Sequence, residues 1–197
     1  SGNDLKGIGY CDLAPWHGVA ADDAPILDRT NNPNRNLARC DDHMGDVGVR
    51  TIGVVRTARA DYGIYLPLLK RIKSDADLQL YLIVSGMHLS PEFGLTVQNI
   101  EADGFEIAEK VEMLLSSDTP EGIAKSIGIG VMGFAQIYAR YRPDILIVLG
   151  DRFEMYAAVI AAVPFKIPIA HLHGGELTQG AIDDALRHSI TKMCHLH

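Results

Sequence analysis

Short apolar runs alternate with segments of helical periodicity from residue 51 onward, and this alternation restricts the fold more than any other feature. Apolar, β-branched runs predict four buried strands: TIGVVR (51–56), LQLYLIVSG (78–86), DILIVLG (144–150) and KIPIAHLH (166–173). Apolar residues at helical spacing predict helices over 62–73, 121–141 and 152–165. A polar helix near 96–103, a short strand near 106–112 and a helix from about 183 complete the pattern. Strands that alternate with helices predict an α/β fold, with a parallel sheet and flanking helices.

Residues 1–48 differ from the rest of the chain. They are rich in Asp, Asn, Gly and Pro and have no sustained periodicity, so we expect an irregular or poorly ordered segment of unknown origin. Residues 49–197 are expected to form the folded domain. Met44 stands shortly before the first strand, which suggests that the folding unit begins near it and that a leader or foreign segment precedes it.

Charge and composition exclude several functional classes. The formal net charge of −7 argues against a nucleic-acid partner, because such proteins normally carry a basic face. Cys11, Cys40 and Cys194 are odd in number and widely spaced, which favours a reducing, cytoplasmic setting. The chain has neither an apolar run of membrane-spanning length nor a secretory signal pattern, so no membrane partner is expected.

Polar clusters follow the predicted strands at their carboxyl ends, where ligands bind in parallel sheets. They are RTARADYG (56–63), SGMHLSPEFG (85–94), GDRFEM (150–155) and HLHGGELTQGAIDDALRH (171–188). Each cluster also has a purely structural interpretation: Asp151 as a helix cap, Arg59 and Asp61 as a surface pair, and His88 as a loop residue. Four clusters on one sheet edge favour a ligand site, in which Arg59 and Arg152 suit a phosphate-bearing ligand.

The last cluster is compatible with two chemistries. On an extended strand, His171 and His173 would point to one face and, with Asp183, could bind a divalent metal as in metal-dependent hydrolases. Alternatively, its carboxylates and nearby arginines could perform metal-free acid–base chemistry. One of the two aspartates is also expected to cap the last helix. Spacing alone leaves both chemistries open, and it places two pairs on common helix faces: Asp183 with Arg187, and Asp184 with His188.

Taken together, RADYG, SGMHL, GDRFEM and HLHGGELTQGAIDDALRHSITKMCHLH resemble the hydrolysing UDP-N-acetylglucosamine 2-epimerases of the sialic-acid pathway, over residues 49–197. Related enzymes acting on UDP-linked diacetamido sugars are similar. Non-hydrolysing epimerases carry an HVEAG-type motif where this chain has HLHGG, which favours the hydrolysing branch. The resemblance implies the Rossmann-like, N-terminal half of a glycosyltransferase-B-like fold that binds a UDP-sugar between two domains. It also implies elimination of UDP followed by hydration, which releases N-acetylmannosamine, without a metal or other cofactor.

The resemblance also implies the site residues. Asp151, Glu176 and Asp183 match acidic positions of the family and are expected to form the acid–base set. His173 stands where other members place a glutamate, so either His173 or Glu176 is expected to perform that role. The residues that resemble substrate-positioning groups are Arg59, Asp61, His88, Arg152, Asp184 and Arg187.

The chain departs from the family at two points. Thr57 replaces the glycine of a TGTRADYG-like motif, which leaves the tightness of the first turn open. The chain also stops at His197, where family members continue for about another domain. We therefore expect an N-terminal half with little or no turnover alone, whose exposed inter-domain face favours a homo-oligomer. A metal-dependent hydrolase remains as one alternative. A non-catalytic sugar-nucleotide-binding half-domain or a glycosyltransferase fragment is the other.

Overall fold

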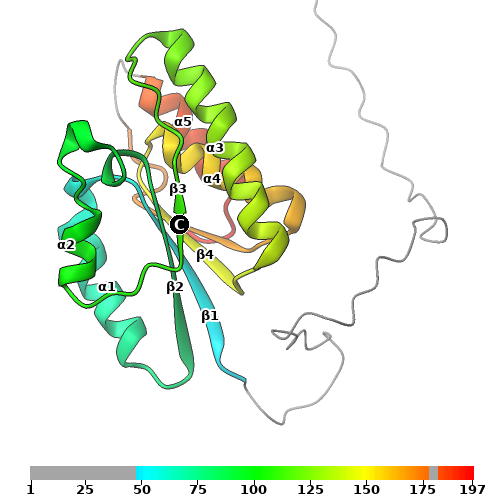
Figure 1. Ribbon diagram of the computed structural model, residues 1–197. Helices are drawn as coiled ribbons and strands as arrows, with labels where there is room; N and C mark the ends of the chain where they lie inside the picture. Colours follow the sequence, from blue (N-terminus) through cyan, green and yellow to red (C-terminus); the bar gives the residue numbers. More distant parts are fainter. Residues whose placement is uncertain (1–47, 178–181) are drawn as a thin grey trace, which may run out of the picture. The chain divides into compact units, whose positions relative to one another are not determined.

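A five-stranded parallel sheet forms the centre of the part of the chain that the computed structural model describes, residues 48–177 and 182–197 (Figure 1). Its order is β3-β2-β1-β4-β5, so the first of the described strands is central. The prediction of an α/β fold is confirmed, whereas the prediction for residues 1–48 falls, except for Gly48, outside the described residues. The strands are β1 (Arg50–Arg56), β2 (Leu78–Ser85), β3 (Glu109–Val111), β4 (Ile145–Leu149) and β5 (Ile169–Leu172).

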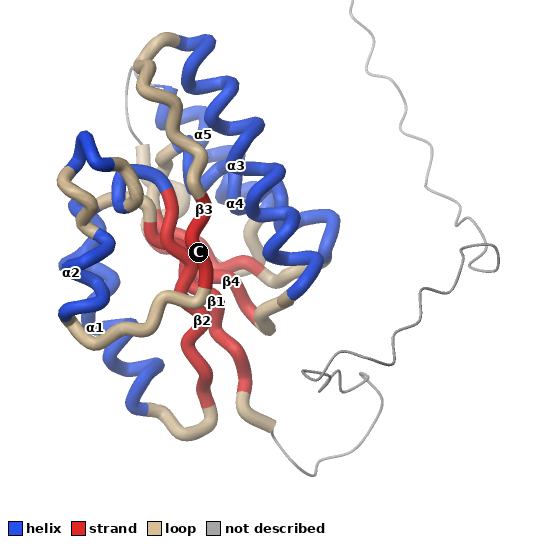
Figure 2. Tube along the Cα trace, in the orientation of Figure 1, coloured by secondary structure: helices blue, strands red, loops and turns tan. Residues whose placement is uncertain are grey.

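Helices cover both faces of the sheet (Figure 2). The helices α1 and α2 pack on one face, and α3, α4 and α5 pack on the other. Successive residues of β1 serve the two layers in turn: Val54 packs with the α1–α2 layer and Val55 with the α3–α5 layer. Both faces of a parallel strand are buried in this way, which explains the unbroken apolar runs in the sequence. The bounds are α1 (Tyr62–Ser74), α2 (Val97–Ala102), α3 (Pro120–Arg140), α4 (Phe153–Ala162) and α5 (Ile182–Met193).

The longest described helix, α3, begins where the sequence contains a capping pattern. Thr119 Oγ1 accepts a hydrogen bond from the backbone N–H of Gly122 at 3.1 Å, and Pro120 occupies the first helical position. None of the helices in the described ranges is both long enough and apolar enough to cross a membrane.

Single-turn 3-10 helices shape the loops on the carboxyl side of the strands. The first follows β1 and spans Arg59–Asp61, and the second follows β2 and spans Gly86–His88. Before the first one, Ala58 has extended backbone angles (φ −139°, ψ 154°). The chain therefore turns after β1 without a left-handed residue, and the glycine that Thr57 replaces is not required here.

The chain adds strands on one side of β1 first and on its other side afterwards. The chain passes from β1 to β2 on one side, while β4 pairs with β1 on the other, with Ile52 opposite Ile145. The loops that leave β1 and β4 therefore diverge, and such a divergence at the carboxyl edge is where open α/β sheets bind ligands.

Strand β5 is shorter than the apolar run predicts. It ends at Leu172, and His173 lies in the following turn with a left-handed φ of 58°. The prediction that His171 and His173 point to one face of an extended strand is therefore wrong, because the backbone turns between them.

Candidate active site

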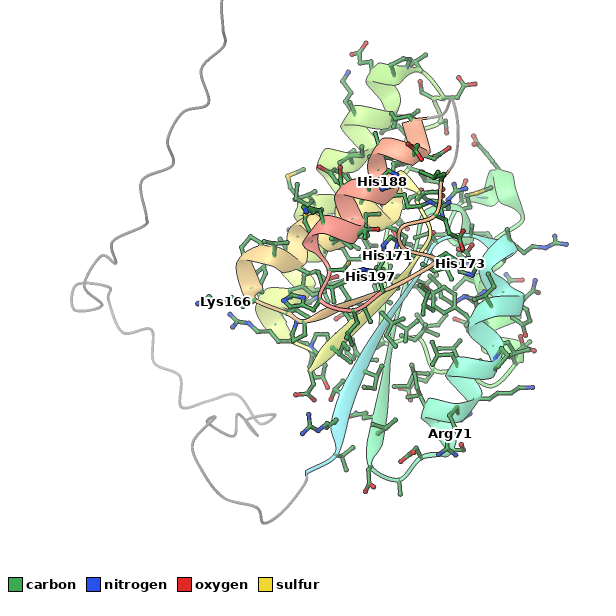
Figure 3. The ribbon with its side chains drawn as sticks, turned by 180° about the vertical axis from the view of Figure 1, so that it is seen from behind. Arg71, Lys166, His171, His173, His188 and His197 are labelled. Atoms are coloured by element: carbon green, nitrogen blue, oxygen red, sulfur yellow. The ribbon has the colours of Figure 1, made fainter. Side chains whose placement is uncertain are left out.

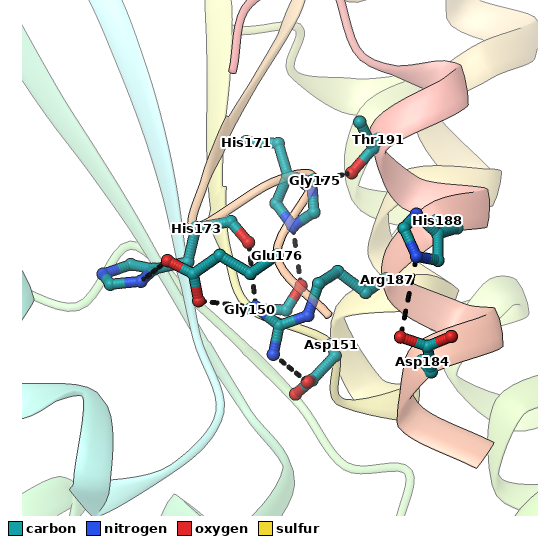
Figure 4. A network of polar contacts seen from close by, with 10 residues as sticks. All are labelled: Gly150, Asp151, His171, His173, Gly175, Glu176, Asp184, Arg187, His188 and Thr191. Carbon is teal, nitrogen blue, oxygen red and sulfur yellow. Dashed lines mark hydrogen bonds and ion pairs between the residues drawn. The ribbon is translucent and has the colours of Figure 1, made fainter. Parts of the chain in front are cut away.

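Arg187 of α5 joins two of the predicted acidic residues beyond the ends of β4 and β5 (Figure 4). Its Nη1 donates to Glu176 Oε2 at 3.1 Å and to the His173 carbonyl at 2.9 Å, and its Nη2 donates to Asp151 Oδ2. The Arg187 side chain is largely buried, which strengthens these charge-assisted bonds. Residues from the third and fourth sequence clusters are thus held in one network.

The His173 ring extends this network by one residue. Its Nδ1 lies 2.8 Å from Glu176 Oε1, and because a carboxylate only accepts, Nδ1–H is the donor. The left-handed backbone of His173 costs about 1–2 kcal/mol for a residue with a Cβ. Figure 3 shows His171 and His173 near the end of β5, whereas His188 lies on α5.

His171 has a structural role. It is buried, its Nε2–H donates to the Gly150 carbonyl at 2.6 Å, and its Nδ1 lies 3.1 Å from Thr191 Oγ1. With Nε2 as the donor, the neutral ring accepts from the Thr191 hydroxyl through Nδ1, and Thr191 Oγ1 in turn accepts from the Gly175 amide at 3.1 Å. Burial lowers the pKa of His171, which favours this neutral form.

The donor set does not fit the metal site that the HxH pattern suggested. Both ring nitrogens of His171 are engaged, and His173 turns toward Glu176. Within residues 48–177 and 182–197, no group of three or more His, Cys, Asp or Glu side chains is arranged to hold a metal ion. His171, His173 and Asp183 therefore do not form a ligand set in this structure.

The glycine pair after His173 is required by packing and backbone geometry. A Cβ on Gly174 would lie 2.9 Å from His171 Nδ1, and Gly175 has a left-handed φ of 76°. The two glycines thus let the chain pass close to the ring of His171 and turn toward Glu176.

Three charged residues follow β4: Asp151 and Arg152 in the loop, and Glu154 in the first turn of α4. The N-cap of α4 is Arg152 and makes no side-chain capping bond, so the interpretation of Asp151 as a helix cap is wrong. Arg152 Nη2 donates to Glu154 Oε1 at 2.9 Å and also contacts Met87 Sδ at 3.3 Å. Glu154 is completely buried, and sequence analysis missed it.

Asp61 and Arg56 face this loop from the end of β1. Burial raises the pKa of Asp61, and the positive charges of Arg152 and Arg56 act against that shift. Asp61 is therefore not simply the surface partner of Arg59. Arg56, also missed from the sequence, is 1% exposed, and its guanidinium nitrogens have no hydrogen-bond partner among the described residues. Its guanidinium lies 5.1 Å from the centre of the Tyr62 ring.

A pocket of about 480 Å³ opens next to Arg56, at the carboxyl ends of β1 and β2. His88 in its wall is buried and its Nδ1 lies 2.7 Å from Thr96 Oγ1. Burial and the positive charge of Arg56 lower the pKa of His88 to about 4, so the ring is neutral at physiological pH. The lining residues are Arg56, Arg59, Tyr62, His88, Thr96, Asn99, Ile100, Ala102 and Asp103.

The two aspartates of α5 have different surroundings. Asp184 pairs with His188 at 3.5 Å, as their shared helix face predicts. Asp183 lies in the first turn of α5. Burial lowers the pKa of Arg152, but the hydrogen bond and charge of Glu154, with the charges of Asp61 and Asp183, raise it overall. The charge of Asp183 thus acts on Arg152. Asp183 and Asp184 both lie inside α5, after Ile182, so the prediction that one of them caps this helix is wrong.

Comparison with known proteins shows the family to which the chain is similar. Residues 70–197 match the family model described as UDP-N-acetylglucosamine 2-epimerase. The GDP/UDP-N,N'-diacetylbacillosamine 2-epimerase (hydrolyzing) of Campylobacter jejuni is 43% identical over 75% of this chain and 38% of its own length. The UDP-N,N'-diacetylbacillosamine 2-epimerase (hydrolyzing) of Legionella pneumophila is 42% identical over 76% of this chain and 39% of its own. The UDP-N-acetylglucosamine 2-epimerase of Neisseria meningitidis is 31% identical over 76% and 38%.

Solved structures share the fold. A crystal structure of a UDP-N-acetylglucosamine 2-epimerase matches with a TM-score of 0.64 and 18% identity, over 75% of this chain and 38% of that chain. A crystal structure of the Neisseria meningitidis enzyme bound to UDP-GlcNAc matches with a TM-score of 0.61 and 16% identity, over 73% and 39%. The expected N-terminal part of a glycosyltransferase-B-like fold is thereby confirmed. The chain spans about 38–39% of the length of the curated relatives reported above.

Proposed function

Because this chain belongs to the UDP-N-acetylglucosamine 2-epimerase family, we propose that it forms the sugar-binding, acid–base part of a hydrolysing 2-epimerase of UDP-linked 2-acetamido sugars. The observation that carries the proposal is the network of Asp151, Arg187 and Glu176 at the carboxyl ends of β4 and β5. The motif HLHGG, which differs from the HVEAG-type motif of non-hydrolysing epimerases and so favours the hydrolysing branch, leads into this network at His173.

The proposed reaction needs one base, one acid and a cationic environment. A base removes the proton at the second sugar carbon while the bond from the first carbon to oxygen breaks, and UDP leaves with the bonding electrons. Water then adds a hydroxyl group to the first carbon and a proton to the second, which gives the free epimerised sugar. Acid–base groups in the proposed site are Asp151, Glu176, Asp183 and His173.

Charged residues near the diverging loops after β1 and β4 suit the departing diphosphate and the sugar. Arg59 is exposed at the pocket wall, and Arg152 is partly exposed beside Asp61. Guanidinium groups match phosphate oxygens in a two-point geometry, so these two arginines are the proposed diphosphate ligands. The proposed sugar-positioning groups are Asp61, His88, Asp184 and Arg187. No step in this scheme requires a metal or another cofactor.

Two substrates are candidates within this function. UDP-N-acetylglucosamine would give N-acetylmannosamine for sialic acid formation. A UDP-linked diacetamido sugar, leading to a related nonulosonic acid, is favoured by sequence identity, since the two relatives named for diacetylbacillosamine are 43% and 42% identical and the one named for UDP-N-acetylglucosamine is 31% identical.

The setting of the reaction is also proposed. The matched relatives are more than twice as long as the matched segment, which supports the proposal that turnover needs a second, nucleotide-binding domain besides the residues described here. We place the enzyme in the cytoplasm, in line with its cysteine pattern. We also propose a homo-oligomer, because an exposed inter-domain face favours self-association.

The test uses the intact enzyme that contains this chain. It is incubated in deuterated water with each of the two UDP-sugars, and UDP release and deuterium at the second carbon of the free sugar are measured. We expect UDP and a free 2-epimer carrying deuterium at that carbon, and at least a hundredfold slower release by an Asp151→Asn variant. Product without deuterium, or no UDP release from either substrate, would exclude the proposed elimination.

A further inference from the structure

We propose that His173, rather than Glu176, is the base that removes the proton at the second sugar carbon, and that Glu176 is a positioning residue for its ring. This assignment rests on the function proposed above. It follows from the different ways in which the two side chains are bonded in the network of Figure 4.

Glu176 is occupied on both sides. Its Oε2 accepts from Arg187 Nη1 at 3.1 Å, and its Oε1 accepts from His173 Nδ1 at 2.8 Å. A proton on either oxygen would displace one of these donors and remove the negative charge that faces a largely buried guanidinium. Both carboxylate oxygens of Glu176 are therefore already engaged with neighbouring donors.

His173 is bonded in the opposite sense. Among the described residues, the ring makes one hydrogen bond, from Nδ1 to Glu176, so the neutral tautomer has its lone pair on Nε2. Within the described part of the chain, Nε2 makes no hydrogen bond, and the side chain is 45% exposed. An accessible imidazole nitrogen, on a ring oriented by a carboxylate at the other nitrogen, is the standard arrangement of a general base.

The backbone also holds His173 in place. Its carbonyl accepts from Arg187 Nη1 at 2.9 Å, and its φ of 58° is a conformation that residues with a Cβ rarely adopt. Strained backbone of this kind persists where the surrounding contacts determine it, and it is concentrated at functional sites. Ring and backbone of His173 are therefore fixed by the same pair, Glu176 and Arg187.

Proton removal and proton delivery at the second carbon take place on opposite faces of the sugar and therefore use different groups. His173 Nε2 takes the proton from the second carbon, the electron pair of that bond forms the double bond to the first carbon, and UDP leaves as the anion. The imidazolium that results is stabilised by Glu176. Epimerisation requires the new proton to arrive on the opposite face, so a group other than His173 delivers it.

The discriminating variant is His173→Asn. An asparagine amide can donate to Glu176 much as Nδ1 does, and asparagine tolerates a left-handed backbone, whereas it has no counterpart of Nε2. We expect kcat to fall by about 10²–10⁴-fold with little change in KM. Glu176→Gln is expected to lower kcat less, by about tenfold, and to shift the acidic limb of the pH–rate profile toward lower pH, because its amide no longer stabilises the imidazolium.

Two further variants complete the experiment. His173→Glu restores a proton acceptor and is expected to recover part of kcat. The acidic limb of its pH–rate profile should lie at lower pH than that of the parent enzyme. His188→Gln, a half-exposed histidine on α5, is the matched control and is expected to remain within twofold of the parent enzyme. Thermal unfolding of each variant shows whether it folds.

The outcomes separate the two proposals. If the parent enzyme releases no UDP from either substrate, the proposed function fails. If the parent enzyme is active and a folded His173→Asn variant retains kcat within threefold, His173 is not the base. A Glu176→Gln variant with a larger loss than His173→Asn would assign the proton transfer to Glu176 instead.

Discussion

Replacing Thr191 by valine tests whether the hydroxyl network around His171 holds the active-site turn in place. Thr191 Oγ1 accepts from the Gly175 amide and donates to His171 Nδ1, both at 3.1 Å. Valine preserves the branched shape and removes both bonds, which contribute about 0.5–1.5 kcal/mol each. His171 is 2% exposed, so its orphaned Nδ1 adds part of the penalty of about 1–3 kcal/mol for an unsatisfied buried group.

We expect Thr191→Val to lower the free energy of unfolding by about 2–3 kcal/mol. For a folded unit of roughly 150 residues, this corresponds to a fall in melting temperature of about 4–12 °C. Circular dichroism during urea and thermal unfolding measures both quantities. Hydrogen exchange at the Gly175 amide reports the local effect and should become faster.

Two controls make the result interpretable. Thr191→Ser restores the hydroxyl and should recover most of the lost stability. Ser189→Ala removes an exposed hydroxyl from the same helix, which donates to the Ala185 carbonyl at 2.8 Å, and should change stability by less than about 0.5 kcal/mol. The reasoning is refuted if Thr191→Val costs no more than Ser189→Ala.

Three further predictions concern buried groups near the diverging loops after β1 and β4. Gly86→Ala should cost about 2–3 kcal/mol in urea unfolding, because φ is +61° and the new Cβ would lie 3.0 Å from Glu154 Oε1; an unchanged midpoint would contradict this. Glu154→Gln should cost about 1–3 kcal/mol, since it leaves Arg152 without a buried counter-charge, and Glu154→Asp serves as the charge-preserving comparison. The pKa of His88 falls to about 4 on folding, so only the unfolded chain binds its proton between about pH 6.5 and 4; stability should decrease by about 3 kcal/mol as the pH falls through this window. A His88→Gln variant with the same pH dependence would show that another group is responsible.

Most of the fold could be predicted because a doubly covered parallel sheet leaves a strong pattern in the sequence. Strands β1 and β4 are buried on both faces and therefore read as unbroken apolar runs. The end of β5 could not be predicted. The run KIPIAHLH continues to His173, but contacts with Arg187 and the glycine pair turn the backbone one residue earlier, and no local propensity records those contacts.

The candidate site was predicted in part for the same reason. Carboxyl ends of parallel strands meet at one edge, which was enough to bring Asp151 and Glu176 together. Arg56 and Glu154 escaped notice because charged residues are normally solvated, and their burial depends on elements distant in the chain. One signal was available for Glu154: the segment FEMYAAVIAA is apolar on all sides, which is typical of a fully buried helix.

The central position of β1 has a consequence for the timing of folding during synthesis. Thr51 in β1 bonds through its amide to Asp144, 93 residues later, at the start of β4. At a synthesis rate of about 5–20 residues per second, the ribosome makes β1 roughly 5–20 s before its second neighbour exists. During this interval β1 can pair with β2, but its other edge stays open to competing strands. The loop after β1 is therefore made long before the loop after β4, and the proposed catalytic edge is completed only after β5 and α5 have been translated.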